Sequence, residues 1–328
     1  MSDKITISGN DSEQRLDRYL RKKFPELPLS VIYKYLRQKK VKIIRGEKKF
    51  HGKKEDMLQK GDEMHLYFDA SQFGGTPKKD VPNFDFVVKS PFFKKNFRIQ
   101  YEDEYLWIAD KLPGIAVHPG TKTPSGKSLI DLFLAYQKSK NPNAIDPKLA
   151  HRLDKDTSGL IIIAKNDLVL RKLSALFRDG GVKKQYLALV QGKLPKKSGM
   201  IESNLLRTEG SKHTKIQVSS HIESKPSRTF YSVREYSPKL NASLVEVTLD
   251  TGRMHQIRVH FASEGHPLAG DDVYGERMWN RKMRDKFGLK RHFLHAYQIA
   301  FPHPITHKKI EISSPLPEDL SRILKNFF

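Results

Sequence analysis

The feature that most constrains the fold is a series of strand-like segments in the second two thirds of the chain. They are rich in β-branched, aromatic and aliphatic residues, which favour strands. They comprise Tyr105–Ala109, Gly159–Ala164, Gln185–Val190, Thr229–Ser232 and Ala242–Leu249. Residues 192–228 have the polar turns of hairpins, and Leu168–Phe177 has the pattern of an amphipathic helix. Strands paired through hairpins, with helices interspersed, predict an α+β domain on a mixed, mainly antiparallel sheet with flanking helices.

Positive charge is concentrated ahead of these strands. The 328-residue chain has 60 Lys and Arg against 37 Asp and Glu, a formal net charge of +23. Residues 15–54 hold 15 basic and 3 acidic side chains, an excess of 12. A solvated basic face can explain any one of these charges. Their density favours a polyanionic partner such as RNA, because binding phosphates releases counterions. No amphipathic anchor or lipidation signal indicates a membrane partner instead.

The basic segment also has the pattern of a small folded module. Apolar residues fall at helical spacing within Leu16–Leu20 and Val31–Leu36, with Ser30 as the expected N-cap of the second helix. Short strands are expected at Val41–Ile44 and Met64–Phe68. Two helices and a small sheet that carry basic side chains predict a compact α/β RNA-binding domain over residues 13–68.

This module is followed by a segment of different composition. Residues 69–95 are rich in Gly, Pro, Ser and Lys, which predicts a flexible linker before a larger domain at 96–328. Within the module, basic side chains on the predicted helices and at their ends are the candidate phosphate contacts. They are Arg15, Arg18, Lys34, Arg37, Lys39 and Lys40.

Several kinds of site are excluded by residues that the sequence lacks. It has no cysteine, which excludes disulfides, thiolate nucleophiles and Cys-based zinc or iron–sulfur sites. His255 and His260 are five residues apart, not the four that place two ligands on one helical face, so no metal site is expected. The sequence lacks the Gly-rich phosphate-binding loop that would indicate a nucleotide cofactor. The N-terminus lacks a signal-peptide pattern, and the longest aliphatic run, Leu160–Ala164, cannot span a bilayer. A soluble, cytoplasmic protein is therefore expected.

The segment that most directly indicates chemistry is His151–Leu160, with the sequence HRLDKDTSGL. It places the carboxylate of Asp154 among basic side chains and polar turn residues, directly before an apolar run. Nearby positive charge lowers a carboxyl pKa by about 1–3 units, so Asp154 is expected to be an anion at neutral pH. Such a group suits nucleophilic or electrostatic catalysis rather than general acid catalysis. A polar turn with a structural aspartate is the alternative that these residues leave open.

A second polar residue falls within a helical pattern near the end of the strand series. Met254, Ile257 and Phe261 lie at i, i+3 and i+7, the buried stripe of a helix that Gly265 would end. Arg258 follows Ile257 and lies at the margin of that stripe. Its guanidinium is therefore expected within reach of a buried carboxylate.

The order of the ten residues 151–160 resembles the active-site motif H-R-L-D-x-[DE]-T-S-G of the RluA/RluC/RluD family of ribosomal RNA pseudouridine synthases. Five further segments are similar to elements of that family. They are Lys111–Pro119, Lys183–Val190, Thr251–Phe261, Gly270–Gly275 and Arg291–Ala296. Leu112 replaces the family's usual proline, and Met254 its usual threonine or serine. The resemblance covers nearly all of 97–325 and is greatest to the RluC branch.

The resemblance implies roles for four residues. The family's aspartate that matches Asp154 is the essential catalytic residue, and the arginine that matches Arg258 pairs with it. The arginine that matches Arg152 enters the RNA stack where the target uridine leaves it, which suits a planar cation. With the resemblance, Tyr186 is expected in the active site, stacked on the extruded uracil and on the same strand face as Lys184. Without it, Tyr186 would be a packing residue and Arg152 a surface ion-pair partner.

The resemblance implies an isomerisation that needs no metal or other cofactor. In pseudouridine formation the N1–C1′ bond breaks, the uracil turns, and C5 bonds to C1′. Asp154 would promote cleavage by attacking the sugar or by taking a proton from it, and both routes stay open. Residues 13–68 resemble an S4-type RNA-binding domain through Arg15–Leu20, Ser30–Lys42 and Lys60–Asp62. The expected substrate is 23S large-subunit ribosomal RNA, although transfer RNA is not excluded, and a monomer is expected.

Three other functions compete with this hypothesis. The chain could be a non-catalytic RNA-binding ribosome-assembly factor with a decayed synthase fold, but intact Asp154, Tyr186 and Arg258 argue against that. A hydrolytic glycosidase would remove the base and leave an abasic site. A nuclease is disfavoured because no cluster of carboxylates suits two metal ions.

Overall fold

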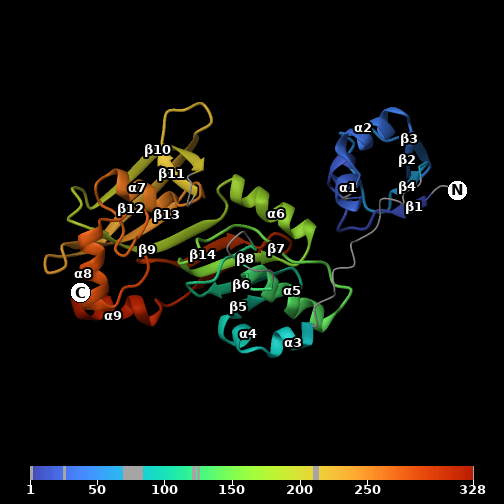
Figure 1. Cartoon of the computed structure of the whole chain (residues 1–328). Helices are drawn as coiled ribbons and strands as arrows, with labels where there is room; N and C mark the ends of the chain where they lie inside the picture. The colour runs from blue at the N-terminus through green and yellow to red at the C-terminus, as the bar shows by residue number, and fades with distance from the viewer. Residues whose placement is uncertain are drawn as a thin grey trace. The chain divides into compact units, whose positions relative to one another are not determined.

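The computed structural model of this chain describes residues 3–24, 27–68, 84–119, 123, 126–209 and 214–327. It divides into two compact units, the first of residues up to 83 together with 166–171, and the second of residues 84–165 and 172–328 (Figure 1). Each unit has its own hydrophobic core. Within the described ranges, none of the helices combines the length and the apolar character that crossing a bilayer requires.

The first unit packs two helices on a small antiparallel sheet, in the strand order β1-β4-β2-β3. Its elements are β1 (Asp3–Thr6), α1 (Leu16–Lys23), α2 (Leu29–Arg37), β2 (Val41–Arg45), β3 (Lys48–His51) and β4 (Glu63–Leu66). Leu16 and Leu20 of α1 and Ile32 of α2 are buried against sheet residues such as Ile43. The helices therefore form where the apolar spacing predicts them.

Two details of this unit differ from the sequence prediction. The sheet begins at Asp3 rather than within the expected range 13–68, because β1 pairs with β4 from Asp3 to Thr6. Ser30 is not the N-cap of α2. The cap is Pro28 (φ −56°, ψ 142°), and Ser30 lies inside the first turn. Proline fixes its own φ near this value, so it can occupy the position just before the helix without strain.

The expected linker at 69–95 is shorter than its composition suggests. Residues 69–83 lie outside the described residues, but α3 (Phe84–Lys89) and α4 (Pro91–Asn96) occupy the rest. Ser90 caps α4 by accepting a hydrogen bond from the Phe93 amide at 3.1 Å. The Phe93 ring then stacks on Phe97, with 4.4 Å between ring centroids. Aromatic packing of this kind stabilises a helix in a segment that is rich in Pro and Lys.

The second unit is built on one large sheet. Its strands follow the order β11-β10-β12-β13-β9-β14-β8-β6-β5, with β15 beside β14 and β7 beside β8. The pairs are antiparallel except for β14 and β8, which are parallel. The strands are β5 (Ile99–Glu102), β6 (Leu106–Lys111), β7 (Lys148–Leu149), β8 (Ser158–Ala164), β9 (Lys183–Gln191), β10 (Ser198–Glu209), β11 (Thr214–Val218), β12 (Lys225–Ser237), β13 (Ala242–Leu249), β14 (Leu294–Pro302) and β15 (Lys309–Ser313). The predicted α+β class with a mixed, mainly antiparallel sheet is confirmed.

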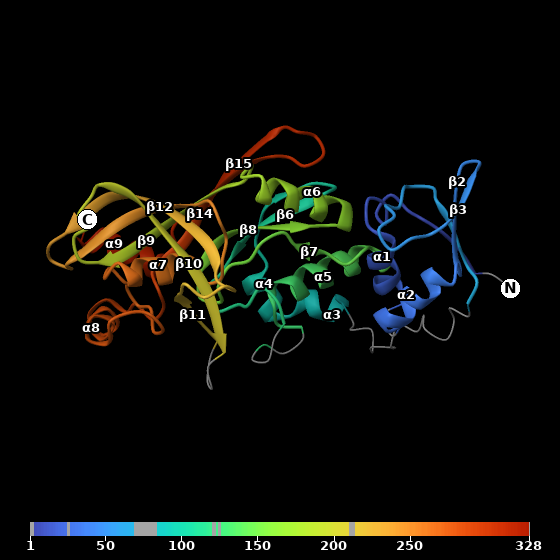
Figure 2. The ribbon, with the colours of Figure 1, turned by 90° about the horizontal axis from the view of Figure 1, so that it is seen from above.

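Helices flank this sheet, and the β14–β15 hairpin projects from it (Figure 2). In addition to α3 and α4, they are α5 (Leu129–Lys140), α6 (Asp167–Arg178), α7 (Gln256–Ser263), α8 (Arg277–Phe287) and α9 (Glu318–Phe327). α7 packs on β10, β11 and β12. Phe133 of α5 and Phe261 of α7 share one core with Ile161 of β8 and Ala188 of β9. The centre of the sheet is thus covered, and every residue of β8 is buried.

One strand pairing brings the functional loops together. β14 lies between β8 and β9, and its parallel register aligns His295 with Ser158 and Ala296 with Gly159. The segments that precede β8 and β14 therefore emerge at the same edge. Gly159 makes this close approach possible. Its φ is +113°, and a Cβ there would lie 2.2 Å from the Ala296 carbonyl oxygen.

Candidate active site

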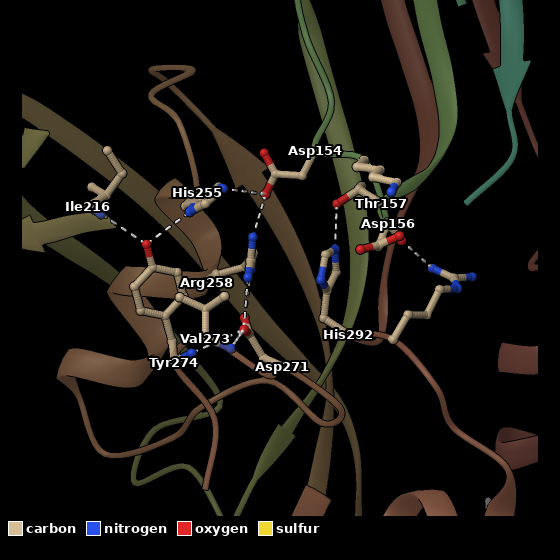
Figure 3. Close-up of polar contacts among 12 residues, drawn as sticks. Asp154, Asp156, Thr157, Ile216, His255, Arg258, Asp271, Val273, Tyr274 and His292 are labelled. Atoms are coloured by element: carbon tan, nitrogen blue, oxygen red, sulfur yellow. Dashed lines mark hydrogen bonds and ion pairs between the residues drawn. The ribbon is translucent and has the colours of Figure 1, made fainter. Parts of the chain in front are cut away.

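The three residues Asp154, Arg258 and Asp271 form a continuous ion-pair chain at this edge (Figure 3). Nη1 of Arg258 donates to Oδ2 of Asp154 at 3.0 Å. Its Nε and Nη2 donate to the two oxygens of Asp271 at 2.7 and 2.8 Å. The Arg258 side chain is 6% exposed and that of Asp271 is fully buried. The planar fork of arginine can serve two carboxylates in this way, whereas lysine cannot.

These contacts keep Asp154 ionised. Burial by itself raises the pKa of a carboxyl, but the nearby His255, Arg258 and His292 and the hydrogen bond from Arg258 together outweigh burial and hold the pKa of Asp154 below its usual value. Burial also disfavours the charge of Arg258, yet Asp271 and Asp154 raise the pKa of its guanidinium. Burial lowers the pKa of the neighbouring His255, which is therefore uncharged at neutral pH. Arg258 is thus the cation that stabilises the Asp154 anion.

In the described part of the chain, the polar contacts of this carboxylate are made by one oxygen. Oδ2 of Asp154 faces Arg258 at 3.0 Å and Nε2 of His255 at 3.8 Å. Among the residues that the structure describes, no hydrogen bond or ion pair reaches Oδ1. Because Asp154 lines the cavities described below, its second oxygen is available to a ligand.

The orientation of His255 is fixed by a tyrosine hydroxyl. His255 precedes α7 in a left-handed conformation (φ 55°), and its Nδ1 lies 2.9 Å from the Tyr274 hydroxyl oxygen. That oxygen already accepts a hydrogen bond from the Ile216 amide at 3.0 Å. The hydroxyl proton is then free to be donated to Nδ1. We infer that neutral His255 carries its own proton on Nε2, toward Asp154.

A buried lysine supports the turn that carries Asp154. Lys111 at the end of β6 is fully buried, and burial lowers its pKa to about 7. Its Nζ donates to the carbonyl oxygens of Leu112, Ile115 and Lys155 at 2.9, 3.0 and 2.8 Å. The last bond ties the loop after β6 to the turn that follows Asp154. Leu112, the departure from the family pattern, therefore contributes its backbone to this arrangement.

The segment before β14 supports the same turn from another side. Nη1 of Arg291 donates to the Asp156 carbonyl oxygen at 3.0 Å. Nε2 of His292 lies 2.8 Å from the Thr157 hydroxyl oxygen, and burial lowers the pKa of His292 to about 4. His292 is thus a neutral structural partner at physiological pH.

Asp154 lies between two cavities. The first, of about 490 Å³, is lined by Tyr186, Ile257 and Leu294 together with Arg152 and Lys184. The ring of Tyr186 is buried on the β9 face that strand alternation predicts. Burial and the charge of Asp154 raise the pKa of Tyr186, so its hydroxyl stays protonated. An aromatic ring beside an ionised carboxylate provides a flat apolar surface next to a reactive group.

The second cavity, of about 680 Å³, shares Arg152, Asp154, His255 and Arg258 with the first. Its other lining side chains include the cations Lys155 and Lys290, together with His118. Arg152 is exposed, and no hydrogen bond or ion pair holds it within the described ranges. The surface ion pair considered for Arg152 is therefore not seen there.

The six basic residues predicted to contact phosphates lie in the first unit. Arg15 forms an ion pair with Asp17 at 2.8 Å, and Nζ of Lys40 lies over the Tyr35 ring. The exposed members of the set are Arg18, Lys34, Arg37 and Lys39.

The sequence predicted that Asp154, Tyr186 and Arg258 lie in one site but indicated no role for the residues around them. Asp271 and Tyr274 lie in Gly270–Gly275, one of the segments similar to the family. A buried arginine requires a carboxylate partner, and this requirement could have indicated Asp271. His255 was weighed only as a metal ligand. Among the described residues, no group of three or more His, Asp or Glu could hold a metal ion. The arrangement, an ionised carboxylate beside an aromatic cavity, is one that an enzyme could use for nucleophilic or electrostatic catalysis.

Comparison with known proteins identifies the family. The sequence pattern of the family described as RNA pseudouridylate synthase matches residues 105–263. The chain is 36% identical over 320 residues, 98% of its length and 94% of the relative, to the ribosomal large subunit pseudouridine synthase C of Haemophilus ducreyi. It is 34% identical to the protein of that name from Escherichia coli K12, over 98% of this chain and 95% of the relative.

A solved structure agrees. That of human RNA pseudouridylate synthase domain containing 1 superposes with a TM-score of 0.53 at 27% identity, over 68% of this chain and 84% of that one. The chain therefore belongs to the RNA pseudouridylate synthase family and is an RNA-modifying isomerase, as the motifs predict.

Proposed function

We propose that this protein converts specific uridines of 23S large-subunit ribosomal RNA into pseudouridine, with Asp154 as the catalytic residue. The observation that carries the proposal is the state of Asp154, which is ionised, held at one oxygen by Arg258 and open at the other. The ribosomal substrate is supported by relatives that match almost the whole chain and are large-subunit pseudouridine synthases. A ribosomal RNA substrate also favours a cytoplasmic protein, which we expect to act as a monomer.

The chemistry balances without an external reagent. The uridine enters with its uracil stacked on Tyr186 and its ribose beside Oδ1 of Asp154. That oxygen either attacks C1′ or takes a proton from the sugar, and the electron pair of the N1–C1′ bond goes to the uracil. The base turns and C5 bonds to C1′. In the first route the bond between Asp154 and C1′ breaks at this step, and in the second the proton returns from Asp154 to the sugar. The C5 proton then leaves and N1 gains a proton. Arg258 holds the Asp154 carboxylate in place throughout.

The surroundings of Asp154 suit RNA with an extruded nucleotide. Arg152 has no partner among the described residues and lines both cavities, so it can fill the space that the uridine leaves in the stack. This offsets an unstacking cost of a few kcal/mol. Lys155 and Lys290 line the second cavity, where we place the phosphates that flank the target.

For the first unit we propose an S4-type RNA-binding role. Two helices, α1 and α2, present Arg18, Lys34 and Arg37 to solvent, and Lys39 is the second residue after α2. These cations, with Arg15 and Lys40, would contact phosphates of structured RNA. These cations would strengthen RNA binding and take no part in the isomerisation step, because Asp154 lies in the other unit.

The test is tritium release from 23S ribosomal RNA that carries [5-³H]uridine. We expect release by the wild-type chain and none by Asp154→Asn, because an amide can neither attack C1′ nor accept the proton. Asp285→Asn, which changes an exposed carboxylate on α8 that lines neither cavity, is the matched control and should release tritium normally. Tight RNA binding without release would instead support an assembly factor. Free labelled uracil in place of tritiated water would indicate a hydrolytic glycosidase.

A further inference from the structure

One lysine of the Tyr186 cavity is buried without a partner. Lys184 lies two residues before Tyr186 on the same face of β9, and both line the 490 Å³ cavity. Lys184 is 8% exposed. Among the described residues, its Nζ forms no hydrogen bond or ion pair, and it lies over the Phe177 ring, 5.1 Å from the centroid. Nearby Asp250 is already paired with Arg228 at 2.6 Å.

This placement disfavours the charged form in the free protein. An ammonium group that is largely buried and has no hydrogen-bond partner in the protein loses part of its solvation. Consistent with this, burial lowers the pKa of Lys184 to about 8. A donor group that faces a cavity in this state has unused hydrogen-bonding capacity, which an acceptor in the cavity would satisfy.

We propose that the ammonium group of Lys184 donates a hydrogen bond to a carbonyl oxygen of the extruded uracil and stabilises the negative charge that develops on the base. This inference rests on the proposed function and adds a catalytic residue to it. Positions two apart on a strand are about 6.6 Å apart along it, within the length of a lysine side chain. The ammonium can therefore reach the edge of a base that stacks on Tyr186.

The chemistry of bond cleavage explains the need for such a cation. When the N1–C1′ bond breaks, its electron pair passes to N1 and is delocalised onto O2 and O4. A nearby cation stabilises the neutral uracil of the bound substrate only slightly, whereas it stabilises the departing uracil anion much more. Lys184 would therefore lower the barrier rather than tighten binding of the RNA.

The cationic form of Lys184 is the one required, which sets the pH dependence. The charged or titratable groups around it are Asp250 after β13, His151 before β8, and Arg178 and Arg253, which line the same cavity. Burial lowers the pKa of His151 to about 3, so it stays neutral. Lys184 is protonated below about pH 8 and loses its proton as the pH rises through that value. Asp154 stays ionised over this whole range.

The test compares single-turnover rate constants at saturating enzyme. Lys184→Met keeps the length of the side chain and should slow isomerisation about 10²–10³-fold, as removal of one charge-stabilising donor does. Binding of the RNA should change less than twofold. Lys183→Met is the matched control, because Lys183 is the exposed neighbour on the other face of β9, and its rate constant should equal that of the wild type.

Two further measurements separate this role from a structural one. The wild-type rate constant should fall above pH 8, whereas that of Lys184→Met should not change there. In 4-thiouridine and 2-thiouridine, sulfur replaces O4 or O2 of the target base and is a weaker hydrogen-bond acceptor. The analogue that slows the wild type but not Lys184→Met identifies which of the two oxygens accepts the hydrogen bond from Lys184.

The outcomes distinguish the two proposals. An unchanged rate constant in Lys184→Met, or a slower one with the wild-type fall above pH 8, would overturn the role of Lys184 alone. Absence of isomerisation by the wild-type chain would overturn the proposed function and this role together.

Discussion

At the scale of single residues, the active site is built around one restrained carboxylate. Arg258 is anchored on Asp271 by two hydrogen bonds and uses its remaining nitrogen for Asp154. Tyr274 lies beneath this chain, with the Arg258 guanidinium 5.1 Å from its ring centroid. Its hydroxyl also holds His255 in place. Each residue restrains the next, so the carboxylate of Asp154, for which we propose the catalytic role, is held in a defined position without a ligand.

Tyr274→Phe tests this arrangement. The variant keeps the ring under Arg258 but loses the hydroxyl that fixes His255 and accepts from the Ile216 amide. We expect the rate constant at saturating RNA to fall about fivefold to tenfold, the equivalent of one hydrogen bond of about 1 kcal/mol, with RNA affinity unchanged. Tyr236→Phe removes a hydroxyl that bonds Asn241 away from both cavities and serves as the control. A wild-type rate in Tyr274→Phe would contradict a positioning role.

At the scale of elements, local pattern predicted most strands and the helix of Arg258, but not the strand that unites the site. Apolar runs such as that of β8 form strands wherever they are buried on both faces. β14 was not foreseen, because Leu294–Pro302 contains two alanines, polar residues and a bulge opposite β9. Two of its three strand partners, β8 and β9, lie more than 100 residues away in the chain. The role of Asp271 likewise exists only once α7 and its own loop are folded together.

Gly159→Ala tests how tightly β14 and β8 must approach. A Cβ at Gly159 would lie 2.2 Å from the Ala296 carbonyl oxygen, at a φ of +113° that disfavours any side chain. We expect a loss of at least about 3 kcal/mol in the free energy of unfolding, measured by urea denaturation. Gly180→Ala has a similar positive φ of +73° but open space around it, and should lose only about 1–2 kcal/mol. Equal losses would show that backbone conformation, not the close approach, determines the need for Gly159.

At the scale of the whole molecule, chemistry and charge are separated between the units. The carboxylate and its partners belong to the second unit, whereas residues 15–54 of the first carry about half of the net positive charge. A cation that contacts only RNA phosphates can strengthen binding without changing the chemical step, provided that its contacts are equal in ground and transition states. The two units should therefore affect different kinetic constants.

The triple variant Lys34→Ala/Arg37→Ala/Lys39→Ala tests this separation. If each side chain neutralises one phosphate, the slope of log affinity against log salt should become shallower by about 2, at roughly 0.7 per single-strand phosphate. The rate constant at saturating RNA should stay at the wild-type value, because the Asp154 site is untouched. A control that removes the same charge elsewhere in the first unit is Lys48→Ala/Lys49→Ala/Lys60→Ala, whose residues are also exposed. If RNA lies along α1 and α2, this control keeps the wild-type slope. An equal change in both variants would mean that the unit attracts RNA through its overall charge, without a defined binding face.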